Sequence, residues 1–221
     1  MALQTATPPT PLVVVRPAAI TVAPARLSRT VKATWEWSAA ALGMLVVLPL
    51  LIVLALWIKL DSRGPVLYRQ TRVGRDGVPF TVLKLRTMYV GADRAYAALV
   101  DGVEPVKQRT DDRITRAGRI LRRTSLDELP QLFNVLGGQM ALIGPRPPLP
   151  HELVLYSPQA RARFAVRPGL TGLWQVSGRA DLTWTEAGRL DQLYVETWSL
   201  RRDLAILART VPAVLGGRGA Y

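Results

Sequence analysis

The chain has 221 residues, of which 49% are hydrophobic, so it can bury one sizeable core and we expect one folded domain with an appendage. It has no cysteine and one histidine, His151, which excludes a disulfide framework, a Cys/His zinc site and a thiol nucleophile. We interpret His151 as a surface or capping residue. The net charge of +13 predicts an anionic partner, either nucleic acid, a phosphate substrate or an acidic bilayer.

The first segment, residues 1–32, is rich in proline, poor in acids and basic toward its end. It shows no sustained hydrophobic period, so we expect a flexible extension. Its first apolar run, residues 12–15, is too short for the core of a signal peptide.

The next segment carries no charge for 21 residues, from Ser38 to Ile58, which as a helix is about 30 Å long and could span a bilayer. Pro49 lies in its middle and predicts a kink at Leu48–Pro49. The positive-inside rule is best satisfied if both ends lie on the cytoplasmic face. We therefore favour a re-entrant helix over 33–60, broken at Leu48–Pro49, and keep a spanning helix as the alternative. The basic flanks are Arg26, Arg29 and Lys32 on one side and Lys59, Arg63, Arg69 and Arg72 on the other.

Residues 66–86 alternate apolar and polar positions on either side of the turn at 74–77, which predicts a β-hairpin. Lys84 and Arg86 are two residues apart and are expected on one face of the second strand. That face is either solvated or presents two cations to a diphosphate.

Arginines then recur every three residues, which on a helix gives a slowly winding stripe. The stripe is either a solvated face or a contact with anionic headgroups. Its members are Arg113, Arg116, Arg119 and Arg122.

The sequence Ser125-Leu-Asp127-Glu128 has the spacing of a capping box, with Ser125 capping a helix whose first turn holds both acids. The surrounding arginines predict that both carboxylates stay ionised. One carboxylate can then act as a nucleophile toward phosphorus while the other holds Mg²⁺. The apolar residues Leu129, Leu132, Phe133 and Leu136 predict a core-packing helix that ends at Gly137-Gly138.

Three later loops offer further phosphate ligands. Gly144 to Pro148 is a rigid turn that holds Arg146 between prolines, and Arg167 and Arg179 lie in two similar glycine-containing loops. After them, 185–198 and 200–215 have the pattern of amphipathic helices. Asp191 and Tyr194 form a D-x-x-Y element on the first of these helices, which either packs on the helix surface or has a functional role. Apolar positions share one face of the second: Leu204, Leu207, Val211 and Val214.

Four segments resemble one known family in content and order. They are LDSRGPVLYRQTRVGRDGVPFTVLKLRTM at 60–88, DDRITRAGRILRRTSLDELPQLFNVLGGQMALIGPRPP at 111–148, RPGLTGLWQVSGR at 167–179 and LDQLYVETWSLRRDLAIL at 190–207. The chain is similar to the bacterial sugar transferases, the small monotopic phosphoglycosyl transferases that start glycan assembly on a polyprenol phosphate. The family usually has Ser-Pro at the membrane break, where this chain has Leu48-Pro49.

The resemblance implies an α+β fold: a compact catalytic domain, 61–221, with a small hairpin and amphipathic surface helices, on the cytoplasmic face of a bacterial membrane. It implies that Asp127 is the nucleophile and that Glu128 supports Mg²⁺. A UDP-sugar would be the donor, undecaprenyl phosphate the acceptor and UMP the leaving group, at the start of exopolysaccharide assembly. Glucose or galactose is the preferred sugar, and acetamido sugars and homo-oligomers stay open. The residues that the family pattern places near phosphate are Lys84, Arg86, Arg113, Arg146, Arg167 and Arg179.

The alternative is a membrane-tethered basic module that binds nucleic acid or anionic lipid without turnover. The charge of +13 and the arginine stripe support it. The chain has no recognised nucleic-acid motif, however, so we do not expect a nucleic-acid partner.

Overall fold

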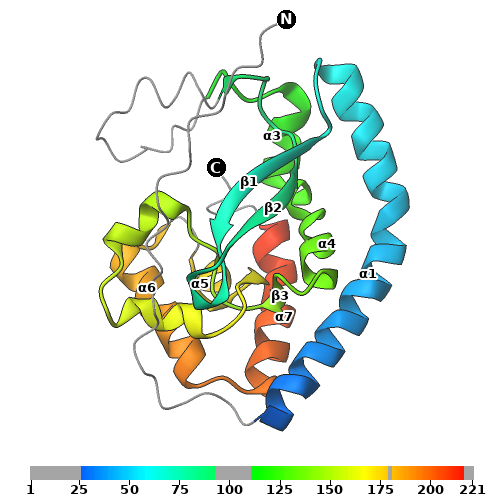
Figure 1. The fold of residues 1–221 in the computed structure, drawn as a ribbon. Coiled ribbons are helices and arrows are strands. Elements are labelled where there is room, and N and C mark those ends of the chain that lie inside the picture. Colours follow the sequence, from blue (N-terminus) through cyan, green and yellow to red (C-terminus); the bar gives the residue numbers. More distant parts are fainter. Residues whose placement is uncertain (1–25, 93–110, 179–180, 217–221) are drawn as a thin grey trace, which may run out of the picture.

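The computed structural model describes residues 26–92, 111–178 and 181–216. A long helix, α1 (Arg26–Asp61), lies along one side of a mixed helical and stranded domain, as Figure 1 shows. The domain holds two separate two-stranded sheets among shorter helices. This architecture confirms the predicted α+β class with a long apolar helix at its N-terminal side.

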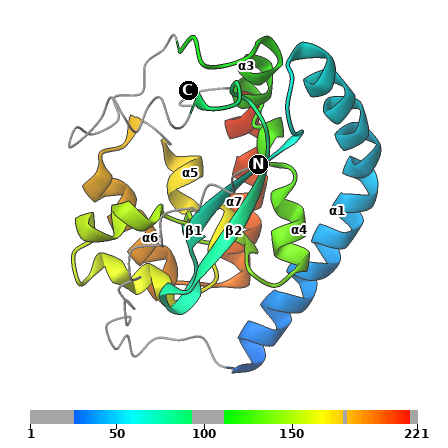
Figure 2. The ribbon, with the colours of Figure 1, turned by 45° about the horizontal axis from the view of Figure 1, so that its top comes forward.

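Helix α1 runs through Pro49 without interruption over 36 residues, about 54 Å. Helical geometry therefore does not break at Leu48–Pro49, and the expected helix-break-helix is not what the structure shows. Figures 1 and 2 show instead a helix that bows around the domain. Leu48 and Pro49 are both on the exposed side, where a missing hydrogen bond lets a helix curve toward its packing partner.

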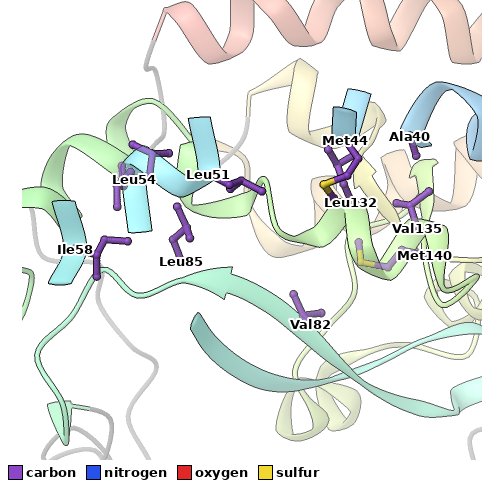
Figure 3. Close-up of a cluster of buried hydrophobic side chains, with 11 residues drawn as sticks. Ala40, Met44, Leu51, Leu54, Ile58, Val82, Leu85, Leu132, Val135 and Met140 are labelled. Atoms are coloured by element: carbon purple, nitrogen blue, oxygen red, sulfur yellow. The ribbon is translucent and has the colours of Figure 1, made fainter. Parts of the chain in front are cut away.

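One side of α1 packs on the domain along most of its length. Met44, Leu51, Leu54 and Ile58 recur at the three- and four-residue spacing of a helical seam and are buried against β2 and α4 (Figure 3). The other side is apolar and bare: Val46 is 72% exposed. Over the stretch long and apolar enough to cross a membrane, Thr30–Asp61, only 22% of the most hydrophobic window is buried. One side of this apolar helix thus packs on the domain, and the other side is not covered by any described residue.

Both ends of α1 are fastened to the domain by polar contacts. Near its start, Lys32 Nζ lies 2.6 Å from Oδ2 of Asp203, which is fully buried, and Glu36 accepts a hydrogen bond from the backbone of Ile143 at 2.9 Å. At its end, Asp61 Oδ2 accepts a hydrogen bond from the backbone of Ala117 at 3.1 Å. Each end of the helix is therefore part of the folded domain.

The predicted hairpin is confirmed. Strands β1 (Leu67–Val73) and β2 (Pro79–Leu85) pair antiparallel, with Leu67 opposite Leu85, around a turn in which Asp76 and Gly77 have positive φ. Directly paired residues share a face, so Tyr68 and Lys84 lie on the same face as the pair Arg72 and Phe80. That face looks toward the segment that carries the two acids.

The predicted capping box at Ser125 is wrong. Ser125 has φ of 55° and makes no side-chain cap, and its backbone N–H closes the end of α3 (Arg116–Arg123) on Arg122. The serine thus ends one helix instead of starting the next, and the acids lie in a 3₁₀ turn, η2 (Leu126–Glu128).

Helix α4 (Gln131–Leu136) follows this turn and ends at Gly137, as predicted. One of its expected core residues is not buried, since Phe133 is 45% exposed. After α4 comes β3 (Ala141–Ile143), which pairs in parallel with β4 (Gly169–Thr171). Between these strands lie two 3₁₀ helices, η3 (Pro150–Leu155) and η4 (Ala160–Ala165).

The last helices are α5 (Leu173–Ser177), α6 (Trp184–Glu196) and α7 (Leu200–Leu215), the latter capped by Ser199 as expected. The stripe formed by Leu204, Leu207 and Val211 is exposed. Helix α7 packs through the neighbouring positions Asp203 and Ile206, so the predicted amphipathic helix leaves Leu204 and Leu207 exposed.

Candidate active site

The two acids lie in η2, between α3 and α4, with strand β2 against them. The Asp127 side chain is nearly buried at 9% exposure, whereas Glu128 is half-buried. Lys84 reaches Glu128 from β2, with its Nζ 2.6 Å from Oε1. None of the ion pairs among the described residues involves Asp127. The fold therefore brings together one paired carboxylate and one carboxylate without an ion pair.

The environment separates the two acids in pKa. Burial raises the pKa of Asp127 to about 6, against the attraction of Lys84 and Arg122 and with the repulsion of Glu128. Burial acts to raise the pKa of Glu128 too, but Lys84, assisted by Arg146 and other cations, outweighs it and lowers that pKa. At neutral pH both are ionised, and Asp127 is a poorly solvated anion, which suits a nucleophile.

Arg146 stands on the loop after β3, where three prolines leave few backbone donors. Its guanidinium lies 3.8 Å from Oε1 of Glu152 and 5.9 Å from the ring centre of Trp174. The loop is held through successive carbonyls: Pro145 accepts from Gly169 N at 2.9 Å, Arg146 from Arg163 Nη2 at 2.6 Å, Pro147 from Arg72 Nη1 at 3.0 Å and Pro148 from Val73 N at 2.9 Å. Arg146 is therefore presented by a backbone fixed on both sides of it.

Arg72 belongs to this region, and the sequence analysis did not select it. It is 7% exposed, donates to Pro147 and to Gln70, and has its pKa lowered to about 10 by burial and by Arg146. A signal was available, since the alternation of β1 puts Arg72 on the face that carries Lys84.

Two other predicted phosphate ligands are occupied elsewhere. Arg86 is buried, and its three guanidinium nitrogens donate to the carbonyls of Ser62, Arg63 and Pro65 at 2.6–2.8 Å. Arg113 forms two hydrogen bonds with the carboxylate of Asp111, at 2.8 and 2.6 Å. Arg86 thus holds the loop that follows α1, and its placement does not support phosphate binding.

Arg167 also does not join the acids. Arg167 lines a separate cavity of about 390 Å³ between α1 and α4, together with Trp37 and Gly138. Arg179 lies outside the described residues. Of the predicted set, the structure gathers Asp127, Glu128, Lys84 and Arg146.

The acids suit Mg²⁺ in their donor chemistry. Mg²⁺ is typically bound by one or two carboxylates together with substrate phosphates and water, so two adjacent acids suffice. One oxygen of Glu128 is engaged by Lys84, which leaves the other and the carboxylate of Asp127 as ligands. Within 26–92, 111–178 and 181–216 no group of three or more potential ligating side chains occurs, so the ion would depend on substrate oxygens.

Comparison with known proteins decides the class. The model of the bacterial sugar transferase family matches residues 27–217, which is most of the chain. The chain belongs to the bacterial sugar transferase family. Its membership makes it an enzyme and agrees with the grouping of acids and cations around η2.

Three relatives show how far the similarity extends. The sugar transferase is 50% identical over 191 residues to the UDP-glucose:undecaprenyl-phosphate glucose-1-phosphate transferase of Caulobacter vibrioides, covering 83% of this chain and 69% of that protein. It is 39% identical to the exopolysaccharide production protein ExoY of Sinorhizobium fredii, covering 86% and 88%. It is 42% identical to the UDP-galactose-lipid carrier transferase of Erwinia amylovora, covering 88% of this chain but only 42% of that longer protein.

Proposed function

We propose that the protein transfers a sugar-1-phosphate from a UDP-sugar to a polyprenol phosphate such as undecaprenyl phosphate, at the start of exopolysaccharide assembly. The observation that carries the proposal is the buried carboxylate of Asp127, which has no ion pair with any described residue and lies beside the Lys84–Glu128 pair. The names of the Caulobacter and Erwinia relatives support the donor and acceptor classes.

In the first step, an oxygen of Asp127 attacks the phosphorus that bears the sugar. A new P–O bond forms to the carboxylate, the bond from that phosphorus to the bridging oxygen breaks, and UMP leaves with the electron pair. The raised pKa of Asp127, about 6, keeps the carboxylate ionised at neutral pH but poorly solvated. No proton needs to be removed from the nucleophile above that pH.

In the second step, a phosphate oxygen of the lipid attacks the same phosphorus. The bond to Asp127 breaks, the carboxylate is regenerated, and the product is a lipid diphosphate sugar. The protein is unchanged after the two displacements, so UMP release and lipid glycosylation occur in equal amounts.

Lys84 and Arg146 have different roles in this proposal because they lie at different positions in the site. Lys84 orients Glu128 and balances its charge at 2.6 Å, and Arg146 offers a planar fork for phosphate oxygens. Glu128 would hold Mg²⁺, which when bound neutralises charge on the phosphoryl oxygens. Arg72 stabilises the carbonyl of Pro147 and so supports the Arg146 loop.

We further propose that α1 lies in one leaflet and does not cross the bilayer. Lys32 and Glu36 at its start and Asp61 at its end are bonded to the same domain. If α1 crossed the bilayer, its two ends would lie on opposite faces, and one of these polar contacts with the domain would have to break or lie within the membrane. Each polar group left unpaired there costs several kcal/mol. The bare apolar side of α1 would then face lipid while the domain, on the cytoplasmic face, presents Asp127 at headgroup height.

The proposed activity is tested by UMP release from a panel of UDP-sugars with Mg²⁺ and undecaprenyl phosphate. We expect turnover with UDP-glucose or UDP-galactose, and loss of turnover in Asp127→Asn. No UMP release from any UDP-sugar, with DNA or anionic vesicles bound in a salt-sensitive way, would favour the non-catalytic alternative.

The membrane arrangement is tested separately, because the chain has no cysteine. Single cysteines at Thr34 and Arg63, both exposed and on either side of the apolar stretch, should react with an impermeant reagent from the same face of sealed vesicles. Labelling from opposite faces would show that α1 spans the bilayer.

A further inference from the structure

A second pair of charged residues lies outside the proposed reaction, in the interior between η4 and α6. Arg163 Nη2 lies 2.7 Å from Oδ2 of Asp191, and the two side chains are only 5% and 2% exposed. The guanidinium carbon is 4.5 Å from the ring centre of Tyr156, which covers the pair on one side. The pair is therefore sealed from solvent.

The burial of this ion pair between η4 and α6 has a large desolvation cost. Burial raises the pKa of Asp191 to about 6 even with Arg163 beside it, so the attraction does not fully offset the loss of hydration. Asp191 Oδ1 and Arg163 Nε make no hydrogen bond to any described residue. Buried ion pairs are often no more stabilising than apolar residues of similar size, so stability alone does not explain this pair.

The same nitrogen, Nη2 of Arg163, also donates to the carbonyl oxygen of Arg146 at 2.6 Å. Asp191 thus fixes the guanidinium that fixes the backbone of Arg146. Arg146 in turn lowers the pKa of Glu128 through its charge, and the carbonyl of the next residue, Pro147, accepts from Arg72 on the hairpin face that carries Lys84. The buried pair and the reaction site therefore meet at a single residue.

We propose that Arg163 and Asp191 are positioning residues that hold Arg146 in the orientation required by the phosphate groups of the donor, an inference that rests on the proposed function. The prolines on either side of Arg146 have no N–H with which to anchor the loop. The carbonyl contact from Arg163 therefore fixes the backbone of the residue that we propose to bind phosphate. With the carbonyl held, the arginine loses less freedom when it binds phosphate.

The test replaces the pair by apolar residues of similar length, Arg163→Met with Asp191→Leu, in the full-length protein. Because neither charge is left alone, we expect the thermal unfolding midpoint to stay close to that of the parent. The carbonyl of Arg146 nevertheless loses its donor, and kcat/KM for UMP release should fall about tenfold, mainly through KM. Glu196→Gln, on the exposed end of α6, is the matched control and should change neither quantity.

A double-mutant cycle separates positioning from general structural damage. If the pair acts through Arg146, adding the apolar replacement to Arg146→Ala should lower kcat/KM no further than Arg146→Ala alone. If the apolar replacement lowered kcat/KM by the same factor in the Arg146→Ala background as in the parent, the proposal would be overturned. An apolar variant with the parent kcat/KM would overturn it as well.

Two outcomes need separate treatment. Should the apolar variant fail to fold, Arg163→Lys takes its place in the same cycle, since it keeps the charge but is too short to reach both acceptors; the same absence of further loss is expected. Failure of the parent protein to release UMP would instead refute the proposed function, which keeps the two failures distinguishable.

Discussion

Asp127 and Asp191 are both buried, and burial raises the pKa of each to about 6. They differ in what lies next to them. Asp191 is paired with Arg163 at 2.7 Å, whereas Asp127 has no ion pair among the described residues and has Lys84 only as a neighbour that is bonded to Glu128. On the proposed function, the same pKa shift accompanies a structural role at Asp191 and a reactive role at Asp127, because only an unpaired carboxylate is available to attack substrate.

Neutralising each acid in turn should give the largest difference between Asp127 and Asp191. Asp127→Asn should lower the rate of UMP release by about 10³-fold or more, since the nucleophile is lost. At pH 8 it should also raise the free energy of unfolding by about 1–3 kcal/mol, because a poorly solvated charge is removed. UMP release and chemical denaturation measure the two effects.

Asp191→Asn should differ from Asp127→Asn mainly in activity. It leaves the nucleophile in place, so the rate of UMP release should fall by about tenfold or less. Because burial raises the pKa of Asp191 to about 6 even beside Arg163, removing its charge should not lower the free energy of unfolding at pH 8. If Asp191→Asn lowered UMP release as strongly as Asp127→Asn, the two acids would not differ in role.

The half-buried ion pair at the site offers a smaller contrast. Lys84 and Glu128 are 22% and 36% exposed, so Lys84→Met should cost less than about 1 kcal/mol of stability. It should lower kcat/KM by about 10- to 100-fold, because a cation beside the phosphoryl oxygens is lost. Arg75→Met, which breaks the exposed Arg75–Asp76 pair at the hairpin turn, is the matched control and should leave kcat/KM unchanged. Equal losses in the two variants would contradict a specific role for Lys84.

The last prediction concerns pH, which should change kcat/KM and the free energy of unfolding in opposite directions. As Asp127 ionises, kcat/KM should rise about tenfold per pH unit below pH 6 and level off above it. A carboxyl whose folded pKa is raised binds its proton more tightly in the folded state, so its contribution to stability falls as pH rises from about 4 to 6. Denaturation of Asp127→Asn across this range should therefore show a shallower fall than the parent. A kcat/KM that stays level down to pH 5 would place the pKa of the nucleophile elsewhere.

Much of the fold follows from local sequence rules. Apolar alternation and the turn glycines placed the hairpin correctly, and Ser199 capped α7 as its residue type predicts. The capping box at Ser125 misled because the rule considers only the residues that follow. The backbone of Ser125 is already used to end α3, so the serine cannot also start a helix.

The site was predictable in its acids and less so in its cations. Asp127 and Glu128 are adjacent in the chain, and the family resemblance placed Lys84 with them, but the fate of each arginine depends on distant carbonyls and carboxylates. Arg86 is engaged by the loop after α1, and Arg163 by Asp191 and the Arg146 backbone. A charge pattern indicates that cations are plentiful, and only tertiary contacts decide which ones remain available to substrate.

The central claim is that Asp127 carries the phosphosugar between the two substrates. It is tested most directly by mixing the parent protein with its UDP-sugar and Mg²⁺ in the absence of polyprenol phosphate, and recording the intact mass of the protein. The parent protein should gain one sugar phosphate per chain, matched by an equal burst of UMP, and Asp127→Asn should show neither. Turnover of both substrates by a protein that never gains this mass, or an adduct that persists in Asp127→Asn, would contradict it.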